Sequence, residues 1–84
     1  MYKIVRIRFQ DLCISVGWTP KEEIPDEEDL NCIAVGFLIS EDDKLVTIAQ
    51  AIGTCDCEDV LNPFTIPRVN IQEMEVIANG DIHT

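Results

Sequence analysis

The sequence predicts a single all-β domain, in which five short antiparallel strands curl into a small barrel with one long acidic loop. Three observations indicate this fold. Apolar residues alternate with polar ones over segments of strand length, glycine and proline residues separate these segments, and 84 residues suffice for one domain. We expect the domain to span residues 1–80 and residues 81–84 to form a frayed tail.

The composition excludes several classes of protein. The chain has 16 acidic and 6 basic residues, a net charge of -10 and a pI near 4.2, so it should repel a nucleic-acid backbone. A hydrophobic share of 46% is too high for a disordered acidic tail. No apolar run is long enough to cross a membrane, and charges interrupt the N-terminal apolar residues, which a signal peptide would keep apart. We therefore expect a cytoplasmic protein (in the host cytoplasm if viral) that contacts neither nucleic acid nor membrane directly.

The first strand is predicted over residues 4–10, where the side chains alternate between two faces. One face carries Val5, Ile7 and Phe9, and the other carries Ile4, Arg6, Arg8 and Gln10. The apolar pattern resumes over residues 12–16, at Leu12, Ile14 and Val16. The strand is therefore expected to continue past a bend near Asp11.

A long acidic excursion follows the first strand. Thr19 is placed to cap a helical turn and Pro20 suits its first position, with Glu22 in the position of a capping box. Pro25 ends this turn, because a proline disfavours helix at the residue before it. The excursion carries six carboxylates, which repel one another and predict a solvated segment: Glu22, Glu23, Asp26, Glu27, Glu28 and Asp29.

Residues 32–40 and 45–52 are predicted to form a hairpin around the polar turn 41–44. The first of these strands has one face of large apolar side chains, which are Ile33, Val35, Phe37 and Ile39. Its other face has the small residues Ala34 and Gly36. A glycine inside a strand marks a sharp bend, a bulge or the close approach of another backbone.

The C-terminal third of the chain predicts a loop and two strands. The loop spans residues 53–63 and has room for a turn of helix around Asp59. A short strand over residues 64–66 stops at Pro67, and a tight connection leads to the last strand, residues 71–78. In that strand we expect Met74 and Val76 to face inward and Glu73 and Glu75 to face outward.

The order of these elements is strand, long excursion, tight hairpin, strand, one-turn connection and strand. It resembles the small barrels of the SH3-like and Sm-like kind, in which the first and last strands commonly pair. The segments Gly17-Trp18, 32–39, Glu41-Asp42, 48–50 and 66–71 also resemble small uncharacterised proteins of bacteriophages and prophages. This second resemblance implies a viral or mobile-element origin and a protein that blocks a host component or sequesters a host signal, as in counter-defence. It supplies no catalytic residue.

Neither catalysis nor metal binding is expected. The only histidine, His83, lies in the predicted tail, where it cannot be held rigidly against a nucleophile. The four cysteines are Cys13, Cys32, Cys55 and Cys57. Only Cys55 and Cys57 are close in sequence, and one intervening residue is a shorter gap than structural zinc sites favour. We expect reduced thiols without metal or cofactor, and Cys13 and Cys32 as core residues.

A small anionic, nucleotide-like ligand is the leading functional expectation. Arg6, Arg8 and Arg68 would bind its phosphate, since guanidinium groups donate paired hydrogen bonds to phosphate, and Trp18 would stack on its base. Two structural alternatives compete with this interpretation. In the first, the arginines only pair across strands with Glu73 or Glu75, and in the second, Trp18 only plugs the open end of the barrel.

Two further functions remain open. The carboxylates at positions 22–29 would imitate a phosphate backbone and bind a host enzyme that normally holds nucleic acid, unless they serve only solubility. Alternatively, the protein is a structural or assembly component. Because a core this small leaves sheet edges and apolar faces uncovered, we expect a homo-oligomer.

Overall fold

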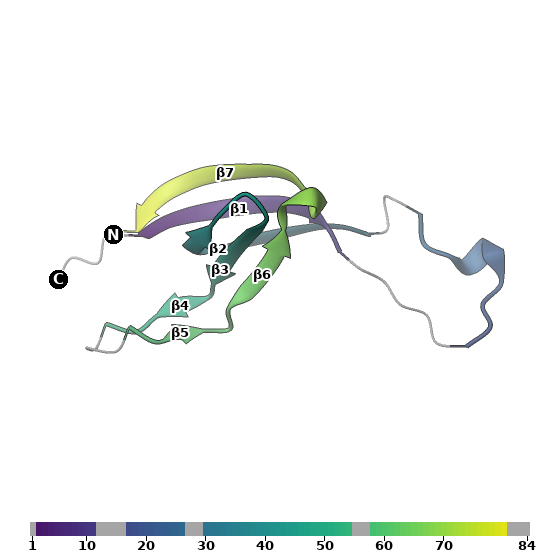
Figure 1. Cartoon of the computed structure of the whole chain (residues 1–84), viewed down its shortest axis with the longest axis horizontal. Coiled ribbons are helices and arrows are strands. Elements are labelled where there is room, and N and C mark those ends of the chain that lie inside the picture. Colours follow the sequence, from purple (N-terminus) through teal and green to yellow (C-terminus); the bar gives the residue numbers. More distant parts are fainter. Residues whose placement is uncertain (1, 12–16, 27–29, 55–57, 81–84) are drawn as a thin grey trace.

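A computed structural model describes residues 2–11, 17–26, 30–54 and 58–80, which fold mainly as antiparallel β-structure (Figure 1). Five strands form one sheet in the order β6-β3-β2-β1-β7, and two form a separate hairpin. The sheet contains β1 (Tyr2–Gln10), β2 (Asn31–Glu41), β3 (Leu45–Ala49), β6 (Phe64–Pro67) and β7 (Ile71–Gly80), and the hairpin contains β4 (Ala51–Ile52) and β5 (Val60–Leu61). The predicted all-β class and the five main strands are confirmed.

The sheet curls but does not close into the predicted barrel (Figure 1). β6 and β7 lie at opposite ends of the strand order and are linked by the 3-10 turn η3 (Arg68–Asn70). Within the described residues no ladder joins them, because β6 has only four residues and pairs along β3 alone. The first and last strands do pair, as expected, with Ile7 opposite Met74. The result is an open sheet with two edges.

One face of the sheet holds the core. Its buried residues come from three strands and are Val5, Ile7, Phe9, Val46, Ile48 and Ile66. Cys32, Ala34, Leu38, Ile71 and Met74 pack against them while remaining partly exposed. The predicted inward faces of β1 and of Met74 are therefore confirmed, as is the core position of Cys32. Val76 lies opposite Val5 in the register but stays half exposed, because the open sheet does not cover it.

Over residues 33–36, β2 turns its small residues toward the core and its large residues outward. Ala34 lies opposite Ile7 and Gly36 opposite Val5 in the ladder with β1. A Cβ atom on Gly36 would approach the Ala49 carbonyl oxygen to 2.8 Å, so this position accepts no side chain. Of the three roles that the sequence left open for this glycine, the structure selects close approach of another backbone. Consequently the larger alternate residues of β2 point away from the core.

The turn between β2 and β3 is tightly hydrogen bonded. Asp42 Oδ1 accepts hydrogen bonds from the backbone N–H groups of Lys44 and Leu45, both at 2.7 Å. The η3 turn closes over it, since the Arg68 backbone N–H donates to the Lys44 carbonyl at 2.8 Å. The Arg68 side chain also donates, from Nε, to the Asp42 carbonyl. These bonds anchor the connection between β6 and β7 to the hairpin.

The predicted return strand is interrupted at Gln50. The Gln50 backbone N–H donates to the Leu61 carbonyl at 3.0 Å, and its side chain accepts from Asn62 Nδ2 at 2.8 Å. β4 and β5 continue beyond this point as a short arm, with Ala51 opposite Leu61. The helical turn for which the loop had room is not present at Glu58 and Asp59, the residues that follow pair as a strand, and residues 55–57 lie outside the described part of the chain.

Residues 17–26 project beyond one end of the sheet (Figure 1). They contain one helical turn, η1 (Lys21–Glu23), which ends before Pro25 as predicted. The N-cap is Pro20 and forms no side-chain hydrogen bond, so the predicted capping role of Thr19 is wrong.

Several predicted features lie outside the described residues. They are the continuation of the first strand over 12–16, the thiols of Cys13, Cys55 and Cys57, the carboxylates of Glu27, Glu28 and Asp29, and the tail with His83. Among the described residues, no helix has the length and apolar character needed to cross a membrane.

Candidate functional site

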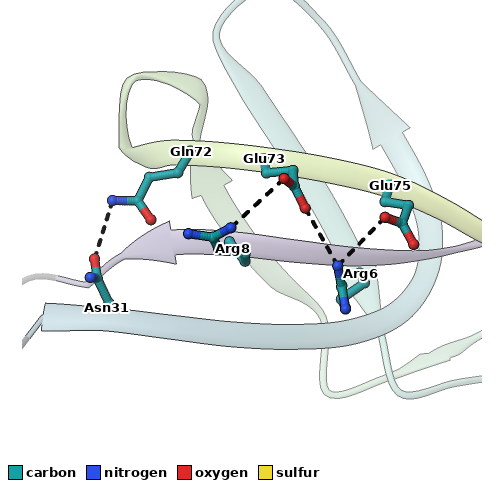
Figure 2. A network of polar contacts seen from close by, with 6 residues as sticks. All are labelled: Arg6, Arg8, Asn31, Gln72, Glu73 and Glu75. Atoms are coloured by element: carbon teal, nitrogen blue, oxygen red, sulfur yellow. Dashed lines mark hydrogen bonds and ion pairs between the residues drawn. The ribbon is translucent and has the colours of Figure 1, made fainter. Parts of the chain in front are cut away.

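Arg6 and Arg8 lie in a row of charges on the outer face of the sheet (Figure 2). The ladder between β1 and β7 places Arg6 opposite Glu75 and Arg8 opposite Glu73. Arg6 Nη2 lies 3.4 Å from Glu73 Oε1 and 3.5 Å from Glu75 Oε2, and Arg8 Nη1 lies 3.8 Å from Glu73 Oε2. The two arginines therefore share the Glu73 carboxylate, and Arg6 also contacts Glu75.

This arrangement matches the cross-strand pairing that the sequence left as an alternative to phosphate binding. All four side chains are partly exposed, so each pair contributes at most about 1 kcal/mol to stability. Their larger effect is on binding, because each guanidinium already faces a negative charge. An incoming phosphate would have to compete with Glu73 and Glu75 for the same N–H groups.

Arg68 belongs to a separate cluster. Its Nη2 atom lies 3.3 Å from Glu41 Oε1, and its Nε donates to the Asp42 carbonyl. Val35 lies opposite Arg6, and Glu41 lies six residues further along β2, which corresponds to roughly 20 Å of strand. The three arginines that the sequence suggested for one phosphate site are thus divided between two places.

Trp18 lies in the projecting segment with its side chain fully exposed, at 104% of the reference area. Its predicted role as a plug for a barrel end is wrong, because the sheet does not close and this side chain does not cover the core. Gly17 precedes it with a φ of +88°, a conformation that favours glycine, and so redirects the chain at the start of the projection. A solvated tryptophan is unusual enough to need a functional explanation.

The described carboxylates of the projecting segment are also exposed. Glu22 and Glu23 lie on η1, where Glu23 N–H donates to the Pro20 carbonyl at 3.0 Å. Pro20 and Pro25 bracket this turn and restrict the backbone on both sides. Two carboxylates are therefore presented on a hydrogen-bonded turn, in the place where the sequence predicts one helical turn before Pro25.

Two groups have perturbed pKa values, and neither belongs to a catalytic arrangement. Hydrogen bonds from the backbone of Lys44 and Leu45 lower the pKa of Asp42, with help from the charge of Arg68. A hydrogen bond from Tyr2 to Glu58 Oε2, at 3.1 Å, raises the pKa of the tyrosine, and the negative charge of Glu58 acts in the same direction. Both effects belong to turns and strand ends that stabilise the fold.

Among the hollows on the described part of the surface, two are well formed, and neither is lined by an arginine. The first has a volume of about 110 Å³ and lies beside the edge-to-face pair of Phe9 and Phe64, whose ring centroids are 5.5 Å apart. The second, about 280 Å³, lies between β2, β3 and the β4–β5 arm and is lined by apolar and amide side chains, such as Val35 and Asn62. Pockets for small ligands usually enclose about 300–1,000 Å³. Both hollows are small for a nucleotide.

Among the described residues, no three histidine, cysteine or acidic side chains converge as metal ligands. No family model, curated protein or solved structure matches this chain. The bacteriophage origin and the SH3-like or Sm-like relationship remain predictions from sequence. A functional proposal must therefore rest on the geometry alone.

Proposed function

We propose that this chain is a non-catalytic binding protein that attaches to a basic surface of a partner protein. The contact is made by residues 17–26, here called the acidic loop. The exposure of Trp18 carries this proposal. Tryptophan is enriched among the residues that dominate protein interfaces, because burying its large ring excludes much water.

The charge of the acidic loop defines the partner. It carries Glu22, Glu23 and Asp26 against Lys21, a net charge of -2 within a chain of -10. Such a protein repels acidic surfaces and accelerates encounter with basic ones. Once the surfaces meet, Trp18 and the exposed Ile24 supply apolar area to hold the complex. The carboxylates select the partner, and the apolar side chains provide most of the affinity.

Broad basic surfaces are characteristic of proteins that bind nucleic acid. We therefore propose a nucleic-acid-binding enzyme as the target, with the acidic loop occupying part of its nucleic-acid site. If the chain is viral, as its resemblance implies, that enzyme would belong to the host, and its inhibition would serve counter-defence.

Capture of a small anionic ligand by Arg6, Arg8, Arg68 and Trp18 has weaker support. Arg6 and Arg8 both form ion pairs with Glu73, and Arg68 forms an ion pair with Glu41 beside the β2–β3 turn. A ligand bound at either cluster would have to displace an existing ion pair.

Capture from cell extract by the immobilised protein tests the proposal. We expect a partner that is retained by the wild type, released by added DNA or by raised salt, and lost with both Trp18→Ala and the double variant Glu22→Gln/Glu23→Gln. The matched control is Asp43→Asn/Asp59→Asn, which removes the same charge from exposed positions outside the loop. This control should retain the partner.

Circular dichroism should give the same spectrum for all variants, because the substituted side chains are exposed. If the loop variants and the control retain the same proteins in the same amounts, the acidic loop is not the binding element. If DNA fails to release the partner while salt succeeds, the partner is basic but its nucleic-acid site is not the contact.

A further inference from the structure

We infer that the outer face of the sheet binds a second copy of this chain, forming a weak two-fold dimer independent of the acidic loop. The face is formed by β1, β2 and β7 on the side opposite the core. Its apolar part is the row of β2 beside β1, which consists of Ile33, Val35 and Phe37. Ile33 and Val35 are 66% and 56% exposed, and they lie where β2 pairs with β1 but not with β3.

The orientation of β2 is forced by packing. Gly36 cannot carry a side chain because the backbone of Ala49 lies too close, so the glycine side of β2 must face inward. The strand nevertheless has large apolar side chains at the alternate, outward-facing positions. Strand positions that face solvent normally carry polar residues. An uncovered apolar row on one face of a sheet is the pattern expected of an interface.

Charge determines which partner fits. Two copies of a chain with a net charge of -10 repel each other over most of their surfaces. On the outer face, however, the charged side chains of β1 and β7 are Arg6, Arg8, Glu73 and Glu75, whose charges sum to zero. A second copy therefore meets the least repulsion here. A face with equal numbers of both charges is also self-complementary, as a two-fold interface requires.

The size of the face predicts the strength of the dimer. β2 has eleven residues, and with strands spaced about 4.8 Å apart the three strands β7-β1-β2 cover roughly 500 Å² in projection. Stable interfaces bury at least about 600 Å² per partner. The area of the outer face is thus at the lower limit for a stable interface. This indicates an equilibrium between monomer and dimer rather than a permanent assembly.

Sedimentation equilibrium of the full chain, at protein concentrations from about 1 μM to 1 mM, tests this inference. The dissociation constant of a weak dimer lies within this range. The wild type should shift from one to two chains within this range. Val35→Glu should weaken the dimer by about tenfold or more, because it places a charge at the centre of the interface. Val69→Glu is the matched control, since Val69 is 93% exposed on η3 and away from the outer face, and it should leave the dissociation constant unchanged.

A milder variant, Val35→Thr, keeps a β-branched residue and guards against a folding defect in Val35→Glu. It should also weaken the dimer, with a smaller effect. A wild type that stays monomeric throughout, an assembly larger than a dimer, or equal effects of Val35→Glu and Val69→Glu would each overturn the inference. If the dimer forms but substitutions in the acidic loop leave partner capture unchanged, the proposed function alone is rejected.

Discussion

Replacing Ile7 with alanine is expected to lower the free energy of unfolding by about 2–5 kcal/mol. Ile7 is fully buried in the middle of β1, between β2 and β7. The substitution removes three carbon atoms from a core of six buried side chains, and the open sheet offers few neighbours to fill the space. For a domain of this size such a loss is a large fraction of the total stability.

Urea denaturation followed by circular dichroism measures this effect. The matched control is Ile33→Ala, the same substitution on the neighbouring strand at a position that is 66% exposed. It should cost less than about 1 kcal/mol. If Ile7→Ala unfolds the protein completely, Ile7→Val should still cost about 0.5–1.5 kcal/mol. Equal losses from Ile7→Ala and Ile33→Ala would mean that the two faces of the sheet are assigned wrongly.

Replacing Gly36 with alanine is the second change with a large expected effect. The new Cβ atom would lie 2.8 Å from the Ala49 carbonyl oxygen and 3.3 Å from Ile48 Cβ, so β2 and β3 must separate. Overpacking of this kind costs about 1–3 kcal/mol. The sign of the change in the free energy of unfolding is informative, because alanine in place of glycine normally stabilises a strand by about 0.5–1 kcal/mol when there is room.

The same denaturation experiment decides between these outcomes. Val35→Ala, at the adjacent position on the outer face, provides the comparison and should cost less than about 1 kcal/mol through reduced strand propensity. A Gly36→Ala protein as stable as the wild type, or more stable, would show that β2 does not approach β3 as closely as described.

The sequence predicts the strands well because their signals are local. Alternation over residues 4–10 identifies both the strand and its buried face, and Pro67 correctly ends β6. Closure of the barrel depends instead on whether two edges meet in space, and the short length of β6 prevents it. The sequence places β4 within one return strand and β5 within a loop, because strands of two residues are too short to display a period.

The candidate sites were harder to predict because they depend on register. Alternation placed Arg6 and Arg8 on one face of their strand, and Glu73 and Glu75 on one face of theirs. Only the pairing of β1 with β7 reveals that these faces coincide and that the charges compensate. For Trp18, hydrophobicity favoured a buried position, and no local signal indicates that the sheet lacks a barrel end for it to cover.

Acrylamide quenching of tryptophan fluorescence tests the central claim most directly, because the chain has a single tryptophan. If residues 17–26 present Trp18 to a partner, its quenching constant in the folded free protein should be close to that in concentrated urea. Binding of the partner should then shield it. A folded, unbound protein whose tryptophan resists acrylamide would contradict the account, since the ring would be packed against its own domain.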